Sequence, residues 1–169
     1  LQTSASILPF MSYNGKIIRE IKLQKLEPFG PSIFDTAQYS LSNIENLGNN
    51  IHALTKDHVL YNYIIFESGD AVNPSIVADN ERIIRKLPFI EDVRIYIQEI
   101  PGETDLVDIL VVTKDNFSIG IGGEIRDVNA GKFELFEKNL LGLGHQLHYL
   151  AHWDGDEESK VTHEFFHIV

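Results

Sequence analysis

The chain has 169 residues, 43% of them hydrophobic, which is enough for one domain with its own core plus an appendage. Fourteen basic residues against 25 acidic ones give a net charge of −11, which argues against a nucleic-acid partner. The absence of cysteine excludes disulfides and thiol chemistry. No apolar run reaches the length of a membrane-spanning helix. The first ten residues lack Met and a basic segment, so we expect a processed end and not a signal peptide.

The first half of the chain predicts a strand, a loop and a helix. Residues 15–26 alternate apolar and polar side chains, which predicts a strand. Residues 31–54 are rich in Ser and Asn and show no sustained period, so we expect a long ordered loop with at most one short element. Thr55 is the predicted N-cap of a helix that ends at Gly69. Its apolar stripe is Val59, Leu60, Tyr63, Ile64 and Phe66.

A second helix and two strands follow. Asn73 is the predicted cap and Pro74 the first helical residue, and Pro88 ends the helix. The expected inward face is Ile76, Asn80, Ile83, Ile84 and Leu87. Residues 92–99 alternate as a strand does, and a tight turn leads to residues 106–113, which are apolar on both faces as in a central strand.

The remaining sequence, residues 116–169, changes character. Four stretches of alternating residues, each about as long as a tilted strand that crosses a bilayer, are separated by short polar or glycine-rich connectors. In the third stretch Leu147, Tyr149 and Trp153 face one way, and His148 and His152 face the other. The last stretch runs to the terminus without a cap, so we expect that the strand pattern has been cut.

The histidines of this region raise the question of a metal site. "HEFFH", with His163 and His167, matches the HExxH pattern of zinc proteases. That site requires a helix, whereas the surrounding β-branched and aromatic residues predict a strand, on which residues four apart lie about 13 Å apart. A cross-strand site that joins His148 or His152 to His163 remains an alternative. We favour a polar strand face and predict no metal and no other cofactor.

The sequence contains no recognisable catalytic machinery. The "GLG" of residues 142–144 lacks the Lys and Ser/Thr of a phosphate loop and precedes a strand pattern, not a helix. Most carboxylates lie in predicted turns. Asp108 is the exception, and we expect it to point outward or to bond a neighbouring backbone group. With no Ser-His-Asp pattern and no nucleophile elbow, we predict that the chain is not an enzyme.

Three segments together resemble a known family. "FESGD", "ERIIRKLPFIEDVRI" and "VDILVVTKD" are similar, in this order and spacing, to a POTRA domain of the outer-membrane insertase and bacterial surface antigen superfamily. "KNLLGLGHQL" resembles the first periplasmic turn of that family's barrel. The 31–54 segment departs from the family because it is longer than the usual link. The resemblance implies an α+β fold: a β-α-α-β-β unit, with a three-stranded sheet and two helices on one face, followed by antiparallel strands.

The resemblance also implies an organisation and a function. Residues 1–14 would form an N-terminal extension, residues 15–115 the POTRA-like domain, and residues 116–169 the first strands of a truncated outer-membrane β-barrel. Such a module is periplasmic, attached to the bacterial outer membrane, and acts in the assembly, insertion or translocation of proteins there. The implied partners are outer-membrane protein substrates, accessory periplasmic proteins or lipoproteins, and outer-membrane lipid through the missing barrel. Four strands cannot close a barrel, so we expect the truncated strands to self-associate.

Two sets of site residues follow as hypotheses. If 106–113 is the central strand, 92–99 is an edge that can accept an extended peptide, with Arg94, Tyr96 and Gln98 exposed along it. Leu147, Tyr149 and Trp153 would face the membrane. The alternative is a soluble α+β binding protein whose histidine-containing C-terminal half binds a ligand or a metal. The sequence names neither the substrate nor the partners, the number of POTRA repeats, the oligomeric state or the conformation of residues 31–54.

Overall fold

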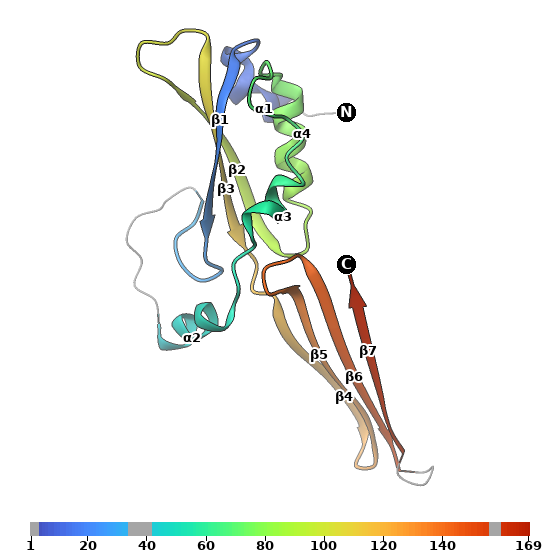
Figure 1. The fold of residues 1–169 in the computed structure, drawn as a ribbon. Helices are drawn as coiled ribbons and strands as arrows, with labels where there is room; N and C mark the ends of the chain where they lie inside the picture. The colour runs from blue at the N-terminus through green and yellow to red at the C-terminus, as the bar shows by residue number, and fades with distance from the viewer. Residues whose placement is uncertain (1–3, 34–41, 156–159) are drawn as a thin grey trace.

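The computed structural model describes residues 4–33, 42–155 and 160–169 and shows two β-sheets arranged end to end (Figure 1). One sheet has three strands in the order β1-β3-β2, and the other has four in the order β4-β5-β6-β7. The strands are β1 (Ile17–Leu26), β2 (Ile90–Glu99), β3 (Leu106–Asp115), β4 (Ile119–Asp127), β5 (Ala130–Leu140), β6 (His145–Asp154) and β7 (Lys160–Ile168). The α+β fold and all seven strands of the sequence prediction are confirmed.

Strand β3 lies at the centre of the first sheet, as its two apolar faces predicted. It pairs in parallel with β1 and antiparallel with β2. Its residues Val107, Ile109 and Val111 are fully buried on one face, and Val112 is 3% exposed on the other. Strands β1 and β2 are therefore the two edges of this sheet.

The main core lies between one face of this sheet and two helices, α3 (Asp57–Tyr61) and α4 (Pro74–Ile84). Val59 and Leu60 of α3 and Val77 and Ile84 of α4 belong to the same buried cluster as the β3 residues. The predicted arrangement of two helices on one face is therefore confirmed. The N-terminal segment joins this core too: α1 (Ser4–Ile7) and the 3-10 helix η1 (Leu8–Tyr13) pack beside α4, and Phe10 is buried.

The predicted helix from Thr55 to Gly69 is wrong in its length and in its cap. Helix α3 is a single turn that begins after Lys56 and ends at Tyr61. The chain then returns beside β1, where the Gly69 amide donates to Ile18 O at 2.7 Å and the Val72 amide donates to Lys16 O at 2.8 Å. These backbone bonds compete with helix continuation, and Gly69 adopts φ +97°, which ends the segment in a turn.

Helix α4 begins where predicted but is rotated relative to the expected face. Asn73 caps it by accepting hydrogen bonds from the amides of Ser75 and Ile76. Asn80 and Ile84 are buried as predicted, but Ile76 is 40% exposed and Glu81 is buried in addition. The Asn80 side chain donates to Tyr63 O at 2.6 Å, and Glu81 bonds the edge of β2. The two polar residues face inward because they satisfy backbone groups that would otherwise be buried without partners.

The long loop contains the one short element that the sequence allowed, helix α2 (Asn43–Ile51). Ser42 and Glu45 form a capping box at its start, in which each side chain bonds the other's backbone amide. Residues 34–41 of the loop lie outside the described residues. Ile33, just before them, is 5% exposed, and its carbonyl accepts a bond from Tyr96. Among the described residues no helix is both long and apolar enough to cross a membrane.

Asp108 corrects a second expectation, because it neither points to solvent nor bonds the backbone. It lies 4% exposed on the sheet face opposite α4, and it accepts hydrogen bonds from Arg19 Nε at 2.7 Å and Lys22 Nζ at 2.9 Å. The hydrogen bond from Arg19, against the opposing effect of burial, lowers the pKa of Asp108 to about 2. A carboxylate in a central strand is thus tolerated because β1 supplies two cations to it.

This ion pair predicts an acid-dependent contribution to stability. Asp108→Asn should lower the free energy of unfolding at pH 7 by about 1–3 kcal/mol, since it removes charge-assisted hydrogen bonds. The folded pKa lies below the unfolded value of about 3.9, so the contribution is present above pH ~4 and is lost as the pH falls toward 2. Urea unfolding at several pH values measures this. The ion-pair role of Asp108 would be contradicted if the difference in free energy of unfolding between the natural protein and Asp108→Asn stayed constant from pH 7 to pH 2. It would also be contradicted if the exposed control Glu103→Gln lost as much stability.

Candidate functional site

The free edge of β2 is the first candidate site. The Ile95 amide does not pair with β3 but donates a hydrogen bond to a side-chain oxygen, Glu81 Oε2, at 3.0 Å. In an antiparallel ladder the backbone groups of alternate residues point the same way. The backbone groups of Val93, Ile95, Ile97 and Glu99 therefore point away from β3 and form the edge.

Side chains of α4 and β2 cap half of this edge. Glu81 occupies the Ile95 amide, Arg85 donates to Val93 O at 2.7 Å, and Asp92 accepts from the Val93 amide at 2.8 Å. Within the described residues, no hydrogen bond occupies the outward backbone groups of Ile97. The edge is thus closed by charged side chains at its first half, a common protection of edge strands, and open toward Glu99.

The predicted residues of this edge have different surroundings. Arg94 is half-buried and lies 3.4 Å from Glu81, Tyr96 is 39% exposed and donates to Ile33 O, and Gln98 is exposed. A groove of roughly 590 Å³ runs beside the strand. Its lining comes from the N-terminal segment, α4 and β2 and includes Phe10, Arg85, Arg94 and Tyr96.

The second candidate site is the four-stranded sheet, whose two faces differ in character. The register places Ile121, Leu135, Tyr149 and Phe165 opposite one another on one face. The next rows of that face contain Leu147, Phe133, Ala151, Ile125, Trp153 and Val161, together with the polar residues Glu137, His163 and His167. We call this the apolar face. The predicted trio Leu147, Tyr149 and Trp153 lies together on it.

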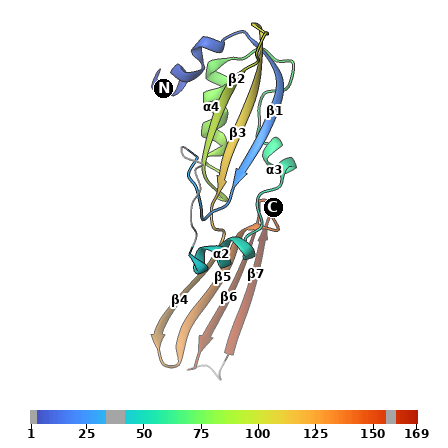
Figure 2. The same cartoon turned by 90° about the vertical axis from the view of Figure 1, so that its left-hand side faces the viewer.

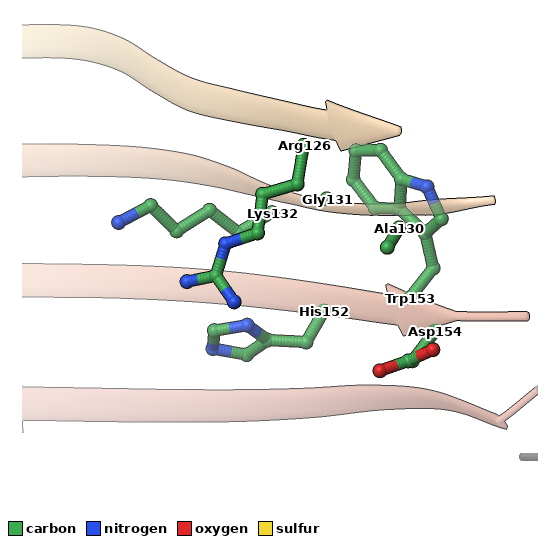
Figure 3. A pocket seen from close by; sticks show the side chains of 7 residues that line it. All are labelled: Arg126, Ala130, Gly131, Lys132, His152, Trp153 and Asp154. Carbon is green, nitrogen blue, oxygen red and sulfur yellow. The ribbon is translucent and has the colours of Figure 1, made fainter. Parts of the chain in front are cut away.

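The opposite face, which we call the polar face, contains Glu134, His148, Lys132, His152 and Glu164, together with Phe136, Leu150 and Phe166. Figure 3 looks onto this face at its far end, where Arg126, Lys132 and His152 come from three adjacent strands around a pocket of about 100 Å³. The period-2 alternation of the sequence therefore became two chemically distinct surfaces.

The histidines do not converge on a metal site. His163 lies opposite Ala151 on the apolar face, whereas His148 and His152 lie on the polar face, so a shared ligand set is contradicted. The "HEFFH" motif lies on strand β7, which lacks the helical geometry that a zinc protease requires. His163 instead contacts the Tyr149 hydroxyl at 2.7 Å, and His167 contacts His145 at 3.3 Å. Within the described part of the chain no group of three His, Asp or Glu residues is arranged to hold a metal ion.

The third site joins the two sheets and was not predicted. His52, Thr55, Asp115, Ser118 and Asn139 form a buried polar cluster, which we call the junction cluster. Asp115 Oδ2 accepts from the Thr55 amide at 2.7 Å and from the Thr55 hydroxyl at 2.8 Å. The imidazole of His52 bridges Asp115 Oδ2 and Ser118 Oγ, each at 3.2 Å.

Asn139, at the end of β5, extends the junction cluster to the second sheet. Its side-chain amide donates to Thr55 Oγ1 at 2.9 Å, and its side-chain oxygen accepts from the Gly144 amide at 2.8 Å. The same side chain therefore holds the turn between β5 and β6 in shape and ties it to the first domain. Nearby, burial raises the pKa of the Glu27 carboxyl, an effect that the charge of His52 opposes and that of Asp115 reinforces.

The glycine-rich turn of residues 141–144 packs directly on the first domain. The Lys56 amide donates to Gly142 O at 2.9 Å. A Cβ at Gly142 would lie 2.3 Å from Leu54 O, and one at Gly144 would lie 3.0 Å from the Phe89 ring. Both glycines have φ +74°. They were predicted to form a tight turn, and they also permit a close approach between the two parts of the chain.

Sequence reasoning missed the junction cluster because its members are far apart in the chain. Thr55 was interpreted as a helix cap, and His52 and Asp115 carry no local pattern. Asn139 was the available signal, since it begins the "NLLGLG" segment that resembles the family's periplasmic turn. Its role became evident only with Thr55 and Gly144 in contact with it.

The structure thus joins a small α+β domain, through a buried polar contact, to a separate antiparallel sheet with two different faces. No family model matches the chain. A curated relative, the outer membrane protein assembly factor BamA of Neorickettsia risticii (strain Illinois), is 30% identical over 117 residues, which are 68% of this chain and 15% of the relative. The chain therefore spans about a seventh of that relative's length.

A solved structure supports the same assignment at the level of the fold. BamA from Haemophilus ducreyi lacking POTRA domains 1–3 superposes with a TM-score of 0.51 at 18% identity, covering 78% of this chain and 22% of that one. The chain is BamA-like and belongs with the outer-membrane proteins of Gram-negative bacteria. The resemblance stated from the sequence motifs is confirmed.

Proposed function

We propose that this chain contains a periplasmic POTRA-like domain (15–115) and the first strands of an outer-membrane β-barrel (116–169), and that it acts in the assembly of outer-membrane proteins without enzymatic chemistry. The observation that supports the proposal most directly is the two-faced sheet. Its apolar face, which includes Leu147, Tyr149 and Trp153, fits lipid, and its polar face fits a barrel interior. The relative's name, an assembly factor, is consistent with this role.

The POTRA-like domain would contribute a docking edge. In our proposal an extended segment of a substrate protein or an accessory partner adds as a strand beside β2, at Ile97 to Glu99, where the edge is open. The Glu81 and Arg85 caps leave Val93 and Ile95 unavailable unless those side chains move. Tyr96 and Gln98 would then flank the added strand, and Arg94 would lie at its end, beside the groove.

Proline at position 97 tests this edge. Ile97→Pro removes an outward amide that β3 does not use, so the sheet should persist while one donor to the incoming strand is lost. Ile97→Ala is the matched control, because it removes the same side-chain packing but keeps the amide. In cells that depend on the variant gene, we expect Ile97→Pro to lower the amount of folded outer-membrane proteins severalfold relative to Ile97→Ala. Equal amounts would contradict docking at this edge, and peptide-induced NMR shifts confined to β1 would place docking at the other edge.

A further inference from the structure

Helix α2 has its apolar side exposed, which reverses the usual arrangement of a helix on a protein surface. Ile44, Leu47 and Ile51 are 82%, 62% and 55% exposed. Their spacing of three and four residues places them in one stripe along the helix. Because the capping box keeps this nine-residue helix formed, the stripe is an ordered surface.

The helix is attached to the rest of the protein by its other side. Gly48 is buried against the ring of Phe29, and a Cβ there would lie 2.5 Å from that ring. The Asn49 side chain bonds both the amide and the carbonyl of Phe29, at 3.1 and 2.8 Å. The polar side thus makes the attachment, and in the described part of the chain nothing buries the apolar stripe.

Two contacts fix the level of α2 relative to the four-stranded sheet. The Phe29 ring packs against Phe117 with a centroid distance of 5.3 Å, and His52, next to the end of α2, contacts Ser118. Phe117 and Ser118 immediately precede β4. Helix α2 therefore lies at the end of the sheet that is next to the POTRA-like domain, as Figures 1 and 2 show.

Helix α2 also lies on the apolar side of that sheet. Figure 3 looks onto the polar face, and there β4 points to the right with β5 below it. In Figure 2, viewed from the side of α2, β4 points down with β5 to its right. Turning Figure 3 in its plane until β4 points down would place β5 to the left of β4, whereas Figure 2 has β5 to the right. Figure 2 therefore shows the opposite, apolar face. Helix α2, which carries the stripe, and the apolar face of the sheet thus lie on the same side of the molecule.

We propose that α2 is an interfacial helix that lies on the periplasmic leaflet of the outer membrane, with Ile44, Leu47 and Ile51 inserted among the phospholipids. The inference rests on the proposed function, since it takes the apolar face of β4–β7 as lipid-facing. A phospholipid surface is the occupant that would cover the apolar face and, at its domain-proximal end, the stripe as one continuous surface. The opposite side of α2 contains Asn46 and Asn49, so the helix is apolar on one side and polar on the other.

Site-specific fluorescence tests the proposal in the natural protein reconstituted into phosphatidylethanolamine/phosphatidylglycerol vesicles. Single cysteines are introduced by Leu47→Cys, Asn46→Cys and Tyr149→Cys and labelled with an environment-sensitive dye. Leu47 and Asn46 are both exposed, so neither change removes core packing. Brominated phospholipids should quench the dye at 47 and 149 and leave the dye at 46 nearly unchanged.

The position-149 probe separates the two proposals. Loss of emission at 149 without loss at 47 would overturn the interfacial helix and leave the membrane face of the sheet standing. Shielding of the 47 probe from aqueous iodide without lipid quenching would show that a protein surface, such as a second copy, covers the stripe, and would also overturn the inference. Absence of quenching at 149 would refute the proposed membrane face, and the proposal for α2 with it.

Discussion

Gly142→Ala should loosen the contact between the first, α+β domain and the β5–β6 turn, with an expected cost of about 3 kcal/mol or more. Alanine at φ +74° costs on the order of 1 kcal/mol by itself. The new Cβ would also lie 2.3 Å from Leu54 O, within the backbone, so the turn must move away. The bond from the Lys56 amide to Gly142 O is then lost, at about 0.5–1.5 kcal/mol, together with the packing of the turn against the first domain.

Hydrogen exchange at Lys56 measures this directly, because its amide partner is Gly142 itself. We expect exchange to accelerate by about 100-fold or more, since each 1.4 kcal/mol corresponds to a factor of ten. Gly102→Ala is the matched control: Gly102 has φ +87°, and a Cβ there meets nothing within 4 Å. It carries the backbone penalty without the collision. Equal acceleration of Lys56 exchange in Gly142→Ala and Gly102→Ala would contradict the role of Gly142 in the close approach of the turn to the first domain. Unchanged exchange at Lys56 in Gly142→Ala would contradict it too.

Asp115→Ala should produce the other large effect, a loss of about 3–5 kcal/mol in the stability of the junction. Its carboxylate is fully buried and accepts the Thr55 amide, the Thr55 hydroxyl and a contact from His52. Alanine removes every acceptor at once and leaves buried donors without partners. Since Thr55 also receives the Asn139 side chain, the loss should extend to the β5–β6 turn.

Exchange of the Thr55 amide and urea unfolding together measure this effect. Asp115→Asn keeps the shape of the side chain and one oxygen that can accept a hydrogen bond. It should therefore reduce the stability of the junction much less than Asp115→Ala does. Asp105→Ala, at an exposed position of the β2–β3 turn, should be close to neutral. If Asp115→Ala lost no more stability and no more Thr55 protection than Asp105→Ala, the junction cluster would contribute nothing to holding the two parts together.

The junction cluster bears on the proposed function because it defines how the edge of β2 is placed relative to strands β4–β7. Asp115 ends β3, Ser118 precedes β4, and Asn139 is the penultimate residue of β5, so all three lie where one sheet gives way to the other. Five buried polar side chains in mutual contact constrain direction better than apolar packing does, because hydrogen bonds require particular geometry. In the proposed function, a strand that adds to β2 would therefore be presented at a defined angle to the barrel strands.

Local pattern determined most of the elements of this protein. The alternation in residues 116–169 specified four strands with two unlike faces, because side chains on a strand point to opposite sides at every second residue. Asn73 and Pro74 specified the start of α4 through their own backbone preferences. The apolar residues of 106–113 specified a central strand, since only a strand covered on both faces buries them. The family resemblance followed from the order of these same elements.

Contacts between distant residues decided the rest. Thr55 became a partner of Asp115 and not a helix cap. Asp108 became an ion-paired residue buried on the sheet face away from α4, and Glu81 faces inward where Ile76 was expected to. The sequence determined the strands, the cap of α4 and the family by itself, because those depend on neighbours in the chain. Only the tertiary structure decided the caps on β2, the junction cluster and the exposed stripe of α2, because each depends on which polar groups had to be satisfied once the elements packed.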